Sequence, residues 1–194
     1  MTKKVINQNT KLNHELIDTI EPKFIFAKKP LNRFNILDTG SNSAQQSNKE
    51  ELLENLKDKI NSIENCKLKE NSNKVILGEG NINSPIMLIG EAPGAEEEKL
   101  GVPFRGEVGE LLSKMLIAIN IKRQNIYISY AINFRPPDDR KPSSTEIKRY
   151  SVFLKEHISI INPKIIVLMG SSAMEAITGI SEKISAERGH WKEV

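Results

Sequence analysis

The alternation of short apolar runs with amphipathic segments constrains the fold more than any other feature of this chain. The runs PIMLIG (85–90), NIYISYAI (125–132) and PKIIVLMG (163–170) each suit one buried strand. The segments 107–121 and 143–161 between them repeat apolar residues at helical spacing, and a short helix is expected after the third run. Strands that alternate with helices predict an α/β fold, in which a parallel sheet has helices on both faces.

Each of the two longer helices is expected to bury one apolar face. The face of the first helix comprises Val108, Leu111, Leu112, Met115, Leu116 and Ile119. The face of the second comprises Ile147, Tyr150, Leu154, Ile158 and Ile161. Ser143 and Glu146 stand three residues apart at the start of the second helix, a spacing that favours a capping box.

The N-terminal quarter of the chain has a different composition. Residues 1–46 are rich in polar side chains and are interpreted as a weakly ordered extension, and TGSNSAQQSNKE (39–50) has the composition of a linker. Apolar residues at helical spacing begin at Leu52. The sequence therefore predicts one α/β domain over residues 47–194.

Bulk properties exclude several classes of protein. The net charge of +3 is too small to indicate a nucleic-acid partner by itself. Cys66 is the only cysteine, so the chain cannot form an internal disulfide or a four-thiolate metal site. No apolar run follows the first lysines as in a signal peptide, and none is long enough to span a membrane. A cytoplasmic location and no membrane partner are expected.

The loop after the first apolar run is where a ligand is expected, because parallel sheets bind ligands beyond the carboxyl ends of their strands. GEAPGAEEEKLGVPFRGEVGELL (90–112) contains five glycines, which permit tight turns. Phe104 could offer its ring to a nucleobase. A structural glycine loop and a core phenylalanine are the alternatives that these residues leave open.

The order of motifs along the chain resembles family 4 uracil-DNA glycosylases. GEAPG, three glutamates, GVPFRG and GELL match the first family motif, and IYISY followed by RPPDDRKP matches the second. CKLKENSNKVILGEG, PKIIVLMG and RGHW match further segments, so the resemblance covers about residues 65–191. It implies a three-layer uracil-DNA-glycosylase-like fold and hydrolysis of the N-glycosidic bond of deoxyuridine in DNA, with the base flipped into a pocket.

The resemblance implies roles for particular residues. Glu91 and Glu97 are the implied catalytic carboxylates, of which Glu91 would line the pocket and Glu97 would place or polarise the attacking water. The implied substrate-binding residues are Ala92, Gly94, Phe104, Gly106 and Tyr130, with Phe104 stacked on the uracil. Uracil-containing DNA is the implied partner, and the candidate phosphate contacts are Arg105, Arg135, Arg140 and Lys141. A charged surface loop is the alternative for the last three.

Three departures from the family pattern affect these expectations. Tyr130 stands where the family has an asparagine that pairs with the uracil edge, and a phenol is larger and lacks a paired carbonyl and NH₂. The printed sequence ends before the family's H-P-S histidine motif, so the last strand is expected to be missing and the third apolar run to lie at a sheet edge. A degraded gene or a second chain that supplies the segment are both open. Of the histidines, His14 and His157 are interpreted as structural or solvated.

The third departure concerns a four-iron cluster that many family members hold. Only Cys66 matches one of its four cysteines, while Ile63, Phe134 and Tyr150 stand at the other three positions. No cluster or other cofactor is therefore expected, and packing is expected to replace it.

Three hypotheses about function follow. The first is a uracil-DNA glycosylase-like protein of base-excision repair that is weakly active or inactive in this form. The second is a non-catalytic module that binds DNA or a base. The third is a degenerate fragment.

Overall fold

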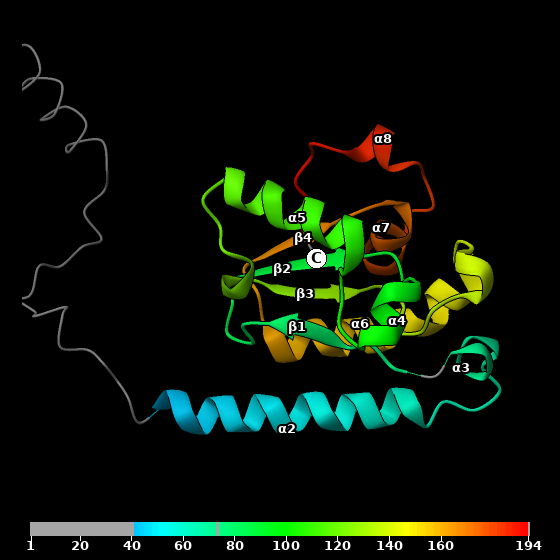
Figure 1. Cartoon of the computed structure of the whole chain (residues 1–194), viewed down its shortest axis with the longest axis horizontal. Helices are drawn as coiled ribbons and strands as arrows, with labels where there is room; N and C mark the ends of the chain where they lie inside the picture. The colour runs from blue at the N-terminus through cyan, green and yellow to red at the C-terminus, as the bar shows by residue number, and fades with distance from the viewer. Residues whose placement is uncertain (1–40, 73, 194) are drawn as a thin grey trace, which may run out of the picture. The chain divides into compact units, whose positions relative to one another are not determined.

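The described part of the chain is built around a four-stranded sheet. A computed structural model describes residues 41–72 and 74–193 (Figure 1). The strands are β1 (Gly78–Gly80), β2 (Ile86–Gly90), β3 (Tyr127–Tyr130) and β4 (Ile165–Leu168), in the spatial order β1-β3-β2-β4. The pairs β2–β3 and β2–β4 are parallel, as the alternation predicts. β1 pairs antiparallel with β3, so the sheet is mixed rather than wholly parallel.

Seven helices surround or extend from this sheet in the described part of the chain. They are α2 (Ser41–Asn61), α3 (Lys67–Asn71), α4 (Ala95–Leu100), α5 (Gly106–Ala118), α6 (Ser144–Ile161), α7 (Ser171–Thr178) and α8 (Ile184–Glu187). Two single 3-10 turns, η1 (Arg123–Asn125) and η2 (Pro137–Asp139), precede and follow β3.

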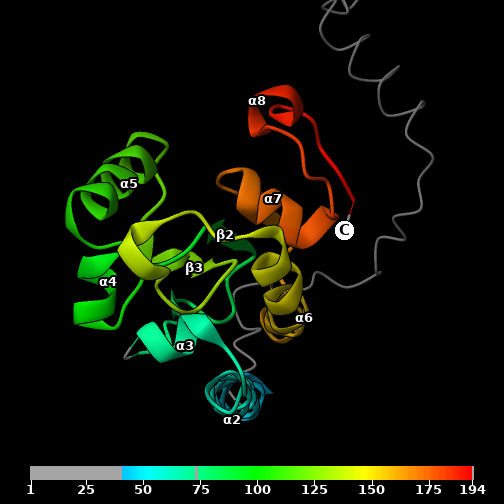
Figure 2. The same cartoon turned by 90° about the vertical axis from the view of Figure 1, so that its right-hand side faces the viewer.

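The two faces of the sheet bury different side chains, because residues of a strand alternate between its faces. Met87 and Ile89 of β2 belong to the core shared with α2, α6 and α7. Leu88 of β2 and Ile128 of β3 belong to a second, smaller core beneath α5. The result is three layers, with α5 on one side of the sheet and α6 and α7 on the other (Figure 2).

α6 forms as its sequence predicts. The Ser143 side chain accepts a hydrogen bond from the Glu146 amide, and the Glu146 carboxylate accepts one from the Ser143 amide, which completes the capping box. The helix ends at Asn162 in the left-handed conformation. Its buried residues are Ile147, Tyr150, Leu154, His157 and Ile161, whereas Ile158 is only partly buried.

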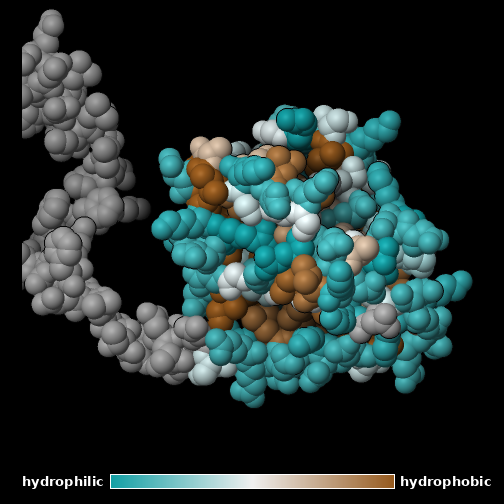
Figure 3. Space-filling view, viewed as in Figure 1, coloured by the Kyte–Doolittle hydropathy of each residue, from teal (hydrophilic) through white to brown (hydrophobic). Residues whose placement is uncertain are grey.

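α5 buries less of its apolar surface than its sequence predicts. Gly109, Leu112 and Leu116 are its buried residues. Val108, Leu111, Met115 and Ile119 are each about 60% exposed, so the prediction of one six-residue buried face is wrong. The apolar arc of the helix is wider than the stripe that contacts the sheet. Part of the hydrophobic surface over α5 is visible in brown in Figure 3.

α2 begins earlier than the linker interpretation allows. The helix starts at Ser41, so residues 41–50 are helical and the linker predicted there is wrong. Leu53, Leu56 and Ile60 of α2 are buried against the core that includes α6. The expected domain boundary at residue 47 falls inside this helix, and residues 1–40 of the extension expected over residues 1–46 lie outside the described residues.

Among the described residues, β4 lies at the edge of the sheet, as the sequence predicts. Ile165 and Val167 are 39% and 41% exposed on it. A hollow of about 390 Å³ lies beside the strand and is lined by residues of β4, α7 and the segment 184–192, including Trp191. Within residues 41–72 and 74–193, no helix is long and apolar enough to cross a membrane.

Candidate active site

The first candidate carboxylate lies directly beyond the carboxyl end of β2. Glu91 follows Gly90, the last residue of that strand, and is half-buried. Its Oε2 atom accepts a hydrogen bond from Ser172 Oγ at 2.5 Å. Ser172 is the second residue of α7, which follows β4, so two parallel strands bring these residues together. Ser172 was not predicted individually, although the segment after Gly170 lies at the edge where ligands bind.

The second candidate carboxylate links two parts of the loop through hydrogen bonds. Glu97 lies in α4 and is 8% exposed. Its Oε2 atom accepts from the Gly94 amide at 3.1 Å, and its Oε1 atom accepts from the Arg105 amide at 3.0 Å. Both oxygens therefore hold backbone groups, and Glu97 joins the start of α4 to the residue before α5.

Phe104 and Tyr130 form a buried aromatic pair between the loop and β3. Their ring centroids are 4.8 Å apart and their planes differ by 17°, which is a stacked arrangement. The Phe104 amide also donates a hydrogen bond to the Tyr130 hydroxyl at 2.8 Å. Burial raises the pKa of Tyr130 well above its ordinary value, and the Glu97 carboxylate acts in the same direction. Phe104 is thus part of the core beneath α5 and not an exposed loop aromatic.

Two glycines permit this pair to form. A Cβ atom on Gly90 would lie 2.6 Å from Phe104 Cζ and 2.9 Å from Tyr130 Cδ1, so both rings rest on bare backbone at the end of β2. A Cβ atom on Gly109 would lie 1.9 Å from the Phe104 carbonyl oxygen. Phe104 itself has a φ of 50°, a conformation that costs a non-glycine residue free energy.

Arg123 and Arg105 hold the same loop from its outer side. Arg123 Nη2 donates to the carbonyl oxygen of Pro103 at 2.7 Å and pairs with Glu79 of β1. Arg105 pairs with the same carboxylate at 2.6 Å. The sequence marked Arg105 as a DNA contact, but neither Arg123 nor Glu79 was predicted to support the loop, because both lie far from it in the chain.

The candidate phosphate contacts beyond β3 are largely engaged with carboxylates. Arg135 hydrogen-bonds both oxygens of Asp139 and also Glu98, and these bonds raise the pKa of Arg135. Arg140 hydrogen-bonds both oxygens of Glu146, and this pairing lowers the pKa of Glu146 to about 2. Lys141 is exposed. The basic surface of this loop is therefore smaller than its count of cations suggests.

The remaining predicted site residues lie along the same loop. Ala92 packs against the larger core, and Gly94 precedes the first residue of α4. Gly106 is the exposed first residue of α5, with a φ of 62°. The structure thus clusters Glu97, Phe104 and Tyr130 and ties Glu91 to α7.

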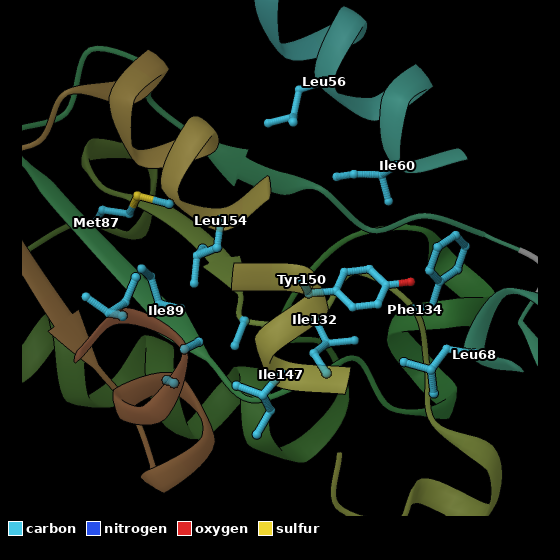
Figure 4. Packing of buried hydrophobic residues seen from close by; sticks show 14 of the residues in the cluster. Leu56, Ile60, Leu68, Met87, Ile89, Ile132, Phe134, Ile147, Tyr150 and Leu154 are labelled. Carbon is cyan, nitrogen blue, oxygen red and sulfur yellow. The ribbon is translucent and has the colours of Figure 1, made fainter. Parts of the chain in front are cut away.

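The four positions that the family resemblance assigns to an iron–sulfur cluster form part of the larger core. Cys66, Ile63, Phe134 and Tyr150 are all buried, and the rings of Phe134 and Tyr150 meet edge to face. Figure 4 shows Phe134 and Leu68 beside the hydroxyl end of Tyr150. One thiol, a phenol, an aliphatic and a phenyl side chain do not fit a cluster that needs several thiolates.

His157 is a buried structural residue. It is 1% exposed, its Nε2 atom lies 2.9 Å from the Tyr127 hydroxyl, and its Nδ1 atom lies 3.4 Å from Ser129 Oγ. Burial lowers the pKa of His157 to about 3, so the ring is neutral. His14 lies outside the described residues.

Comparison with known proteins agrees with the motif order and the fold. The family model of the uracil DNA glycosylase superfamily matches residues 77–193. A type-4 uracil-DNA glycosylase from Thermotoga maritima is 37% identical over 143 residues, which are 73% of this chain and 74% of that protein. Type-4 uracil-DNA glycosylases from Sulfurisphaera tokodaii and Archaeoglobus fulgidus are 39% and 34% identical, over 64% and 66% of this chain and 57% and 64% of their own lengths. The chain therefore belongs to the uracil DNA glycosylase superfamily, and its relatives place it with the type-4 uracil-DNA glycosylases.

Proposed function

We propose that this protein acts in base-excision repair as a uracil-DNA glycosylase-like protein, which binds uracil-containing DNA and hydrolyses the N-glycosidic bond of deoxyuridine slowly. The observation that supports the proposal is the arrangement of residues 90–106. This loop carries Glu91, Glu97 and Phe104 beyond the carboxyl ends of parallel strands, in a chain similar to type-4 uracil-DNA glycosylases.

The two carboxylates suit different tasks in this reaction. The deoxyribose becomes cationic as the base departs, so a carboxylate that orients the attacking water also stabilises the charge. We assign that task to Glu91, which is held through one oxygen by Ser172. Glu97 has both oxygens occupied by backbone amides, so its task is to hold the loop in place.

Turnover is expected to be slow because Tyr130 lacks the groups that recognise uracil. An amide side chain offers a carbonyl and an NH₂ to the base edge, whereas a phenol offers one hydroxyl. That hydroxyl already accepts a hydrogen bond from the Phe104 amide. Removing one donor to a developing anion typically costs about a hundred- to a thousandfold in rate.

A second candidate function is a DNA-binding module without catalysis. The stacking of Tyr130 on Phe104 favours it, because the aromatic ring assigned to the base is already covered on one face. This candidate retains DNA as the partner and makes no use of Glu91.

An excision assay separates the two candidates. The full chain, Glu91→Gln and the exposed control Glu182→Gln are incubated with a uracil-containing oligonucleotide in a preparation free of other glycosylases. Slow uracil-dependent cleavage that Glu91→Gln abolishes and Glu182→Gln retains supports the glycosylase. Cleavage unaffected by Glu91→Gln contradicts the role of Glu91, and DNA binding without any cleavage supports the binding module.

A second set of proteins tests the cause of slow turnover. Tyr130→Asn alone is expected to remain slow, because groups that act together do not restore activity singly. A fusion that combines Tyr130→Asn with the H-P-S segment of a type-4 relative is expected to be faster. Rapid turnover by the unmodified chain would contradict the proposal that Tyr130 limits the reaction.

The cytoplasm is the proposed location, and microscopy of a tagged chain checks it. If a second chain that carries an H-P-S segment copurifies with this protein, that result would support the hypothesis that a second chain provides the segment.

A further inference from the structure

The slot at the carboxyl ends of β2 and β3 is shaped by one residue that has no side chain. Gly90 and Tyr130 are paired in the parallel register of these strands. Strand periodicity places Tyr130 on the same face as Ile128, beneath α5. Because Gly90 has no side chain, a flat ring can lie on the sheet at this point, and the edges of two rings do so.

Tyr130 fills this slot in the manner of a ligand. Its ring stacks on Phe104 with a centroid separation of 4.8 Å, as a planar base stacks on an aromatic side chain. Its oxygen accepts a 2.8 Å hydrogen bond from the Phe104 amide, as a pyrimidine carbonyl oxygen would. The phenol is 4% exposed, so a planar molecule cannot reach this face of Phe104 while the phenol remains there.

We propose that Tyr130 is an internal occupant of the base pocket, whose phenol takes the place of a flipped pyrimidine on Phe104, so that the chain binds DNA without reading the base. This inference rests on the proposed function, because it identifies the Phe104 slot with the base pocket. It goes beyond that function because it states that the position of the Tyr130 side chain decides whether the site recognises a base.

The contacts of Tyr130 explain why the phenol stays in place. A base that enters the slot must displace a buried ring and replace both the stack on Phe104 and the hydrogen bond from its amide. The new contacts are of the same kinds as those lost. Displacement therefore brings no net gain of contacts, so Tyr130 remains the main occupant of the slot in the presence of DNA, and a base enters it only in the minor fraction of molecules that slow excision requires.

Cavity complementation tests the inference directly. Tyr130→Ala removes the ring and leaves a space of its shape, whereas Tyr130→Phe keeps the ring and removes only the hydroxyl. p-Cresol reproduces the tyrosine side chain. We expect p-cresol at millimolar concentration to raise the melting temperature of Tyr130→Ala and to leave the wild type and Tyr130→Phe unchanged. Free uracil is expected to compete with p-cresol for Tyr130→Ala.

DNA binding supplies the second measurement. Two single-stranded oligonucleotides differ only at one position, which carries uracil or an abasic tetrahydrofuran. The wild type and Tyr130→Phe are expected to bind both equally. Tyr130→Ala is expected to prefer the uracil oligonucleotide by roughly 5- to 100-fold, the range that base stacking on one aromatic supports.

Several results would overturn the inference. One is a wild type that prefers the uracil oligonucleotide as strongly as Tyr130→Ala does. Another is a folded Tyr130→Ala that binds p-cresol but not uracil, or that binds neither. If Tyr130→Ala does not fold, Tyr130→Asn replaces it in both measurements. Failure of every protein to bind either oligonucleotide would contradict the proposed function instead, while the p-cresol and uracil measurements would still decide whether Tyr130 occupies a base-shaped slot.

Discussion

The Sγ atom of Cys66 lies 3.2 Å from the hydroxyl oxygen of Tyr150, and both side chains are buried. The two residues are 84 positions apart, and α6 brings Tyr150 to the segment that precedes α3. At two of the four positions that the family resemblance assigns to cluster cysteines, this chain has a thiol–phenol hydrogen bond inside a hydrophobic core.

We therefore predict that the protein holds no stoichiometric iron–sulfur cluster. Cluster ligation requires several thiolates, and the chain has one cysteine. The full chain is purified without oxygen, and its iron content and visible absorbance are measured. The matched control is a triple variant, Ile63→Cys, Phe134→Cys and Tyr150→Cys, which restores four thiols. One cluster bound within each wild-type monomer would contradict the prediction.

We predict that Gly109→Ala destabilises the protein by about 2 kcal/mol or more, because the added Cβ atom would meet the Phe104 carbonyl oxygen at 1.9 Å and force backbone movement. Urea unfolding followed by circular dichroism measures the change. Glu110→Ala is the control, since Glu110 is exposed in the same helix. Equal stability of the two variants would show that α5 does not depend on close approach to Phe104.

We predict that acid weakens the fold below pH 6.5 through His157. The pKa of the folded histidine is about 3, below the ordinary 6.5 of an unfolded one, so the unfolded chain binds the proton first. The stabilisation is complete above pH 6.5 and is lost as the pH falls toward 3, at about 1.4 kcal/mol per pH unit.

Unfolding by urea at several pH values between 6.5 and 5 isolates this effect, because the stabilisation from Glu146 is lost only as the pH falls from its ordinary pKa of 4.5 toward its folded pKa of about 2. His157→Gln is expected to be less stable at pH 7 but nearly independent of pH over this interval. A wild type whose stability is flat between pH 6.5 and 5 would contradict the prediction.

We predict that DNA affinity is salt-sensitive and limited by the ion pairs of the loop after β3. Lys141→Ala should weaken binding to all sequences and reduce the slope against salt by about one. Asp139→Asn should strengthen binding, because it removes the negative charge and one of the two acceptor oxygens that hold Arg135. Titrations of a fluorescent oligonucleotide over a salt series measure both changes. Unchanged slopes would remove this loop from the DNA interface.

Much of the fold follows from local patterns. β2, β3, β4 and α6 form where periodicity and the Ser143–Glu146 capping pair predict them, because these signals depend only on near neighbours. The burial of α5 does not follow, since the sequence shows how wide an apolar arc is and not how much of it is covered. The start of α2 at Ser41 is likewise hidden by a polar composition that is typical of linkers.

The candidate site divides in the same way. The motifs mark Glu91, Glu97, Phe104 and Tyr130, and the structure shows the Tyr130 ring buried and stacked on Phe104. The hydrogen bond between the Phe104 amide and Tyr130 depends on a φ of 50° that nothing local indicates in a phenylalanine. The contact between Ser172 and Glu91 joins residues 81 positions apart and requires the strand order β3-β2-β4.

The close approach of Gly109 to the Phe104 carbonyl couples the position of the Phe104 backbone to that of α5. Because the Phe104 carbonyl approaches Gly109 closely, movement of the Phe104 backbone is expected to move the first turn of a 13-residue helix, which is roughly 20 Å long. An environment-sensitive dye on a cysteine introduced at the exposed Ala118, in a Cys66→Ser background, should therefore report displacement of the Phe104 ring from the far end of α5. Molecules that enter the slot become visible in this way even when no bond is cleaved.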